Sequence, residues 1–166
     1  HYIGNDQEFD RYTVSTEMDE RTLREIYLPP FKAAVQRADI KAVMTGYNPF
    51  QGTYCTENSF VIDILKKEWG FKGMLMSDWA CTYSADKNGL DLEMGSNDWF
   101  VREKLLPLIQ DGTITEELIN ERSEEYMVLA SRWDSLTVRN CVRTFHCLIR
   151  MPTDWLWKKQ KKELSC

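Results

Sequence analysis

The stretch Trp69–Trp79 reads W-G-F-K-G-M-L-M-S-D-W, and it limits the possible folds more than any other part of the chain. Its apolar run Met74–Met76 follows Gly73 and is too short for a buried helix, so it is predicted to be a buried strand. Asp78 then lies at the C-terminal end of that strand, beside the indole of Trp79. In parallel α/β barrels this end of the strands carries the chemistry.

Asp78 has a second possible role at this stage. An aspartate just after a strand often caps the next helix, with its carboxylate accepting backbone N–H groups of the first turn. From this stretch alone the cap is the more frequent role, and both readings stay open.

Helices and strands are predicted to alternate along the chain. Polar residues 1–18 are expected to form a loop, as are residues 49–56 around Gly52, and the Pro29-Pro30 pair should break or kink the first helix. Such alternation favours βα units and a parallel sheet, but three strands are too few for a barrel of eight. The expected helices are 19–31 with an extension to 38, 57–69, 85–89, 98–110 and 115–122, and the expected strands are 42–44, 74–76 and 90–94.

Composition excludes several classes of function. The net charge of −5 argues against nucleic acid as a partner. The chain has no apolar run long enough to cross a bilayer and no visible signal peptide, so we expect a soluble protein without a membrane partner. Its five cysteines contain no C-x-x-C pair and its two histidines lie far apart, so we expect no metal site.

Several motifs together resemble the N-terminal barrel domain of family 3 glycoside hydrolases, the β-glucosidase type. The resemblance covers residues 1–122 and runs in order and almost without gaps. It implies an α/β protein that forms the C-terminal portion of a (β/α)8 TIM-type barrel, incomplete, with about three parallel strands. The motifs are H-Y-I-G-N-D-Q-E at 1–8, D-E-R-T-L-R-E-I-Y-L-P-P-F at 19–31, V-M-T-G-Y-N at 43–48, E-W-G-F-K-G-M-L-M-S-D-W at 68–79 and G-L-D-L-E-M at 89–94.

The resemblance also implies roles for individual residues. Asp78 matches the nucleophile of the family's S-D-W motif, which reverses the preference for a helix cap. His1, Met44, Tyr47 and Trp79 match positions that contact the bound sugar. A second domain supplies the acid/base glutamate in this family, and no cofactor takes part. Each of three residues also has a purely structural alternative to sugar binding. His1 is then a disordered terminal residue, Met44 packs in the core and Tyr47 is a core aromatic.

Residues 123–166 differ from the rest of the chain. They hold 8 basic and 5 acidic residues, whereas residues 1–122 hold 13 and 21. One interpretation is a basic, partly disordered tail. We favour another: back-translation in a shifted frame restores family-like residues, so a single-base deletion near Arg122 is predicted to have put a poorly ordered tail out of frame.

The expected function is hydrolysis of O-glycosidic bonds as part of a retaining, exo-acting β-glucosidase that takes a β-glucoside or oligosaccharide. The segment on its own is expected to be inactive. Alternatives are a non-catalytic carbohydrate-binding remnant that uses Trp79 and Tyr47 as a stacking platform, or a non-functional gene fragment. The sequence leaves the sugar, the oligomeric state and the compartment open.

Overall fold

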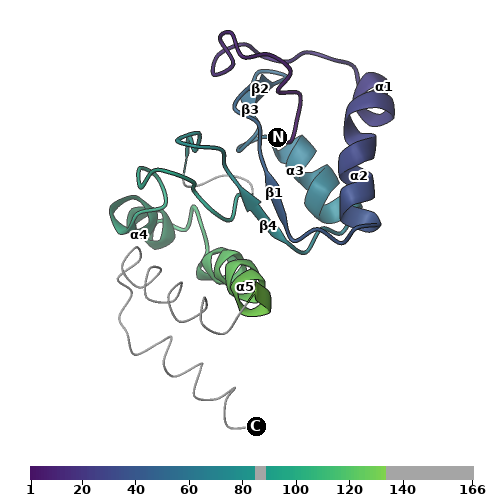
Figure 1. Cartoon of the computed structure of the whole chain (residues 1–166). Coiled ribbons are helices and arrows are strands. Elements are labelled where there is room, and N and C mark those ends of the chain that lie inside the picture. Colours follow the sequence, from purple (N-terminus) through teal and green to yellow (C-terminus); the bar gives the residue numbers. More distant parts are fainter. Residues whose placement is uncertain (85–88, 134–166) are drawn as a thin grey trace.

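A computed structural model describes residues 1–84 and 89–133 (Figure 1). The predicted helix at 85–89 therefore lies almost wholly outside the described residues. So does the tail from residue 134 onward. The frameshift and the domain border at residue 122 stay predictions, and helix α5, Glu116–Trp133, runs across that border.

Two predicted strands form the centre of the fold and pair in parallel. Strand β1, Ala42–Met44, lies beside β4, Met74–Met76, with Val43 opposite Leu75. Thr45 N extends the pair by donating to the Met76 carbonyl over 2.9 Å. Both strands have the predicted bounds, because short apolar runs with buried residues leave little freedom for other structures.

The third predicted strand, 90–94, is reduced to a single parallel bridge between Met76 and Leu92. The cause is the side chain of Asp91, which accepts the Leu75 N–H over 2.7 Å and so occupies a place in the hydrogen-bonded ladder. Lys66 Nζ contacts both carboxylate oxygens of Asp91, at 2.6 and 2.7 Å. The ion pair thus ties β4 to the preceding helix.

The N-terminal segment adds a strand position that the sequence reading missed. Residues 1–18 were expected to be a loop, yet Tyr2 forms a parallel bridge with Thr45. Tyr2 N donates to the Met44 carbonyl over 2.8 Å. The buried Tyr2 side chain explains the pairing, since its hydroxyl donates to the Val61 carbonyl over 2.6 Å. Four parallel segments therefore lie side by side in chain order.

The proline pair was predicted to break or kink the first helical region, which does not break there but changes from a π-helical to an α-helical form just before Pro29. Asp19 caps it by accepting the Thr22 N–H. The helix α1, Glu20–Thr22, passes into a π-helical turn, Leu23–Tyr27, and then into α2, Leu28–Gln36. The wide π-turn lets Pro29 enter at the start of α2, where a missing N–H costs little.

The second helical region has a similar mixed form. Helix α3, Ser59–Asp63, is capped by Asn58 and continues as a π-helical stretch, Ile64–Glu68. Between β1 and α3 lies a hairpin of β2, Pro49–Phe50, and β3, Thr53–Tyr54, where only a loop was predicted.

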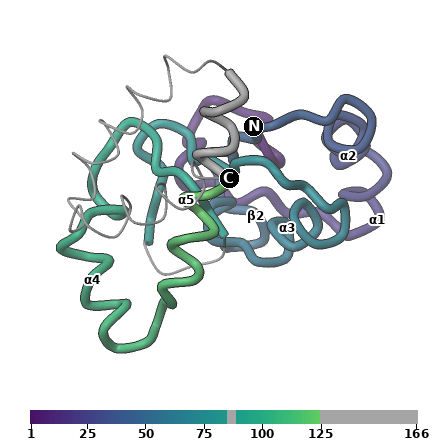
Figure 2. Tube along the Cα trace, turned by 90° about the horizontal axis from the view of Figure 1, so that it is seen from below, coloured from purple at the N-terminus to yellow at the C-terminus, as the bar shows by residue number. Residues whose placement is uncertain are grey.

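The main core lies between the strands and these two helical regions. Helices α1, α2 and α3 lie together at one end in Figures 1 and 2, and α4, Arg102–Gln110, lies at the other. Apolar side chains of α4, α5 and the segments that flank α4 form a smaller second cluster around Leu105 and Ile114. The side chains that fill the main core include Tyr2, Leu23, Val43, Phe50, Val61, Leu65, Phe71 and Leu75.

Candidate active site

The carboxylate of Asp78 lies two residues beyond the end of β4. It is buried, with 2% of its surface exposed, and the preceding Ser77 is fully buried. Ser77 is bound twice to the segment 92–94, because its N–H donates to the Leu92 carbonyl and its hydroxyl accepts the Met94 N–H. These bonds fix the backbone that carries Asp78.

The two oxygens of Asp78 have different surroundings. Oδ1 accepts the backbone N–H of Trp79 over 2.7 Å. Oδ2 is also buried, and it faces side chains instead of the backbone, with His1 as its closest partner within the described part of the chain. Residues 79–84 contain no helix for Asp78 to cap. The buried Oδ2 is therefore the oxygen that can react with a ligand.

His1 reaches this oxygen from the neighbouring N-terminal segment. Its Nε2 lies 2.8 Å from Asp78 Oδ2, and the ring is partly exposed. The other ring nitrogen, Nδ1, lies 3.1 Å from the Asn5 amide nitrogen. Because that amide can only donate, the proton of a neutral His1 belongs on Nε2, facing the carboxylate.

Tyr47 forms the wall beside His1 and Asp78. Its ring contacts His1 edge-on, with centroids 5.8 Å apart, and contacts Tyr12 at 5.1 Å. Burial, and then the Asp78 carboxylate, raise the pKa of the Tyr47 hydroxyl to about 12. The hydroxyl is therefore a neutral donor at physiological pH.

Arg11 lies against the open face of Tyr47. The guanidinium carbon is 4.1 Å from the Tyr47 ring centroid and 5.2 Å from that of Tyr12. Glu8 pairs with Arg11 over 2.7 Å. The contact places a cation beside the aromatic wall, an arrangement that stabilises both partners.

Met44 and Trp79 complete the set of predicted residues. Met44 ends β1 and is half-buried, and alternation along the strand places its side chain opposite to that of the core residue Val43. Trp79 follows Asp78 directly, and 61% of its surface is exposed. The structure therefore brings His1 and Tyr47 to Asp78, while Met44 and Trp79 flank them through neighbouring strand ends.

Sequence reasoning missed Arg11, Tyr12 and Asn5. All three belong to the N-terminal segment that was read as an irregular loop. The available signal was a cation between aromatic and acidic residues, E-F-D-R-Y, a few positions after His1. Only the contact with Tyr47 shows that this loop returns to the site.

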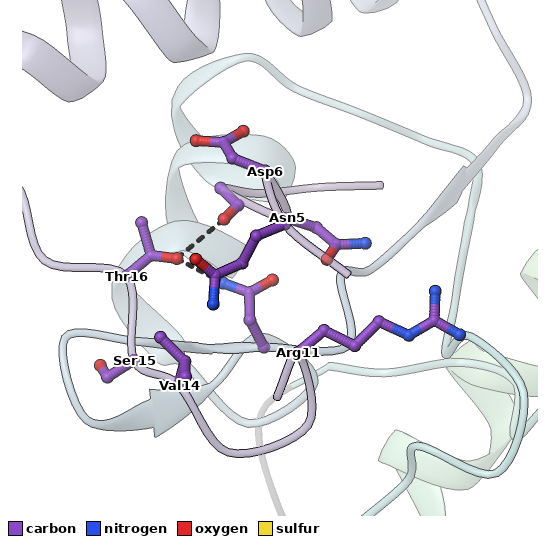
Figure 3. Close-up of a pocket in the computed structure, with 9 residues that line it drawn as sticks. Asn5, Asp6, Arg11, Val14, Ser15 and Thr16 are labelled. Atoms are coloured by element: carbon purple, nitrogen blue, oxygen red, sulfur yellow. Dashed lines mark hydrogen bonds between the residues drawn. The ribbon is translucent and has the colours of Figure 1, made fainter. Parts of the chain in front are cut away.

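A polar pocket of about 200 Å³ lies within the same N-terminal segment (Figure 3). Thr16 donates to the Gly4 carbonyl and accepts from the Asn48 amide, as the dashed lines show. The Arg11 side chain points away from Thr16 in this view. The pocket does not include Asp78, and its bonds hold the loop in the position that presents His1 and Arg11.

The described residues contain no group of three or more His, Cys, Asp or Glu side chains that could hold a metal ion. Among them, no helix has the length and apolar character needed to cross a bilayer.

These features define a segment of a parallel α/β barrel with a buried carboxylate at the C-terminal edge of its strands. A family model described as the glycosyl hydrolase family 3 N terminal domain matches residues 1–128. The chain belongs to this family. The match ends six residues beyond the predicted border at residue 122.

Curated relatives support the same assignment. A beta-glucosidase of Rhizobium radiobacter is 43% identical over 137 residues, which is 80% of this chain and 17% of the relative. Beta-glucosidase B of Emericella nidulans is also 43% identical over 137 residues, 80% of this chain and 16% of the relative. The chain thus spans about a sixth of the length of these relatives.

Solved structures show the same fold. A family 3 beta-glucosidase from Bifidobacterium adolescentis matches 84% of this chain and 20% of its own, with a TM-score of 0.73 and 30% identity. A beta-glucosidase of Kluyveromyces marxianus in complex with glucose matches 75% of this chain and 16% of its own, with a TM-score of 0.71 and 36% identity. The incomplete α/β barrel predicted from the sequence is confirmed.

Proposed function

We propose that this chain is the nucleophile-bearing part of a retaining, exo-acting β-glucosidase. The observation that carries the proposal is the buried Asp78 carboxylate at the C-terminal end of β4, whose Oδ2 faces His1 with Tyr47 beside it. The names of the curated and solved relatives, which are beta-glucosidases, support it.

The reaction would follow the double displacement of retaining glycosidases. Asp78 Oδ2 forms a bond to the anomeric carbon of the glucoside while the bond from that carbon to the leaving oxygen breaks. The leaving oxygen takes a proton from a general acid, which the family resemblance assigns to a second domain. Water then attacks the same carbon, gives its proton to that second carboxyl group and releases Asp78.

The surrounding residues would hold the sugar in place. His1 Nε2 and the Tyr47 hydroxyl are donors beside the carboxylate, so each can bind a sugar hydroxyl or stabilise the charge on Asp78. The exposed Trp79 indole offers an apolar face to the ring of the sugar. Met44 borders the same strand end.

The test uses a hybrid enzyme in which residues 1–128 replace the matching segment of the Rhizobium radiobacter relative. The hybrid is incubated with an activated 2-deoxy-2-fluoro-β-glucoside, which forms the glycosyl-enzyme quickly and releases it slowly. Peptide mass spectrometry should find the fluoroglucosyl group on Asp78. Labelling of another carboxylate, in a hybrid that turns over an aryl β-glucoside, would disprove the assignment.

The two alternatives from the sequence are tested by the same protein. A carbohydrate-binding remnant would bind glucose in a calorimeter without turnover or labelling. A non-functional fragment would do neither. Turnover together with labelling of Asp78 leaves only the enzymatic role.

A further inference from the structure

The indole of Trp79 rests directly on Gly95. A β-carbon added to Gly95 would lie 2.0 Å from Trp79 Cε3 and 2.7 Å from Cζ3, far inside van der Waals contact. Gly95 also has a φ of +74°, a conformation that other residues adopt only with strain. Only glycine therefore permits the observed position of this indole.

Hydrogen bonds join the two segments on either side of this contact. Ala80 N donates to the Met94 carbonyl over 3.0 Å, and Met94 N donates to the Ser77 hydroxyl over 2.9 Å. These bonds lie immediately beside Trp79 on one segment and Gly95 on the other. A larger residue at 95 would have to turn the indole itself.

The position of Gly95 is set in turn by the carboxylate of Glu93. Glu93 Oε1 accepts the Ser96 hydroxyl over 2.6 Å, and Oε2 accepts the Phe100 N–H over 2.7 Å. The backbone N–H groups of residues 98 and 99 also donate to this carboxylate. Together, these charge-assisted hydrogen bonds hold the turn 93–100 in one conformation. They also explain why the predicted helix 98–110 begins only at Arg102.

We propose that the turn 93–100, called here the Glu93 turn, is a positioning element that sets the tilt of the Trp79 indole through Gly95. Its consequence is tighter binding of the glucosyl ring, because the tilt of the indole decides how well its apolar face meets the C–H groups of the sugar. This inference rests on the proposed β-glucosidase function. Gly95 acts through Trp79 and does not itself touch the sugar.

The experiment measures kcat and KM of the hybrid enzyme for an aryl β-glucoside, together with the inhibition constant for glucose. Gly95→Ala should raise KM and the glucose inhibition constant by about tenfold or more, because misplacing a positioning group weakens binding strongly. The kcat value should change much less. The matched control is Gly112→Ala, since Gly112 has a φ of +78° but an added β-carbon there would meet nothing within 4 Å.

A double-mutant cycle separates the positioning role from general damage. In a Trp79→Leu background, Gly95→Ala should have no further effect on KM, because the indole it displaces is gone. A second variant, Glu93→Gln, keeps the size of the side chain but removes its charge and replaces one accepting oxygen by a donating amide. The altered turn should shift KM in the same direction by a smaller factor.

Two results would overturn the inference. One is a Gly95→Ala enzyme whose KM stays within about twofold of the Gly112→Ala control. The other is an unchanged effect of Gly95→Ala in the Trp79→Leu background. Labelling of Asp78 is measured on the same proteins, so labelled Asp78 with a neutral Gly95→Ala refutes this inference alone. Labelling of another carboxylate in a hybrid that turns over refutes the proposed nucleophile, while the KM cycle still decides the role of Gly95.

Discussion

His1 Nε2 lies 2.8 Å from Asp78 Oδ2, and the segments that carry these two residues lie on opposite sides of β1. The contact crosses the end of β1, so both side chains point across the same edge of the sheet. A histidine and a carboxylate that meet in this way depend on the pairing of both segments with the central strand. The site is therefore a property of the assembled sheet.

Replacing Asp78 by asparagine should abolish turnover in the hybrid enzyme. Asparagine fills the same space and keeps an acceptor for the Trp79 N–H, but its amide cannot form the glycosyl ester. We expect kcat for an aryl β-glucoside to fall by several orders of magnitude with unchanged circular dichroism. Activity above about a tenth of the parent value would show that Asp78 is not the nucleophile.

Removing the Tyr47 hydroxyl should have a smaller effect. Tyr47→Phe keeps the ring contacts with His1 and Arg11 but deletes a donor beside a charged oxygen, a loss of about 1.5–3 kcal/mol. The expected fall in kcat/KM is therefore about 10- to 150-fold. Kinetics equal to those of the parent would reduce Tyr47 to a core aromatic.

Tyr47 also predicts a change of stability at alkaline pH. Its folded pKa of about 12 exceeds the ordinary tyrosine value of about 10, so its contribution is complete below about pH 10 and is lost as the pH rises toward about 12. The difference in melting temperature between parent and Tyr47→Phe hybrids should shrink over this range. Tyr2 and Tyr83, whose pKa values burial also raises, are common to both proteins and cancel. A constant difference would contradict the prediction.

Breaking the Lys66–Asp91 pair should destabilise the hybrid. Lys66→Met removes the cation that contacts both oxygens of the buried Asp91 carboxylate, a loss of about 3 kcal/mol in the free energy of unfolding. Lys67→Met is the matched control, because Lys67 pairs with Asp63 on the surface of the same helical region and its loss should cost no more than about 0.5 kcal/mol. The half-inactivation temperatures of the two variants provide the comparison, and equal values would refute it.

The 166-residue chain expressed alone should fold poorly and lack activity. The Tyr2 segment and the Leu92 segment form the two edges of the described strands, and unpaired edges promote association. The family resemblance assigns the general acid to another domain. The lack of a general acid alone slows such reactions by about 10²- to 10⁴-fold. Size-exclusion chromatography, thermal circular dichroism and an aryl β-glucoside assay test this. A cooperatively melting monomer with turnover would refute it.

The sequence predicted the central strands because their patterns were local. The bounds of β1 and β4 follow from short apolar runs, whereas the hairpin at 49–54 depends on Gln51 and Gly52, which have φ values of 49° and 78°. Such a pair forms the tight turn that favours antiparallel strands. Gln-Gly is a weaker signal than Asn-Gly for this turn, so a loop was predicted instead.

The residues of the candidate site likewise fall into those that the sequence predicted and those that only the structure shows. Asp78, Tyr47 and His1 were found through motifs, and the structure brings them together. The neighbouring Arg11 is placed by a long loop whose path depends on the hydrogen bonds of Thr16 and Asn48. No periodic sequence pattern predicts such a path. Likewise, only the three-dimensional contact shows that Gly95 lies beneath Trp79.

The order of the parallel segments has a consequence for how the chain forms its sheet. Each segment pairs with the one that precedes it in the sequence, from Tyr2 through β1 and β4 to Leu92. Pairing between successive segments closes shorter loops than any other order of the same parallel segments would, which lowers the entropy cost of forming the sheet. During synthesis, the partner of each new segment has therefore always left the ribosome before it.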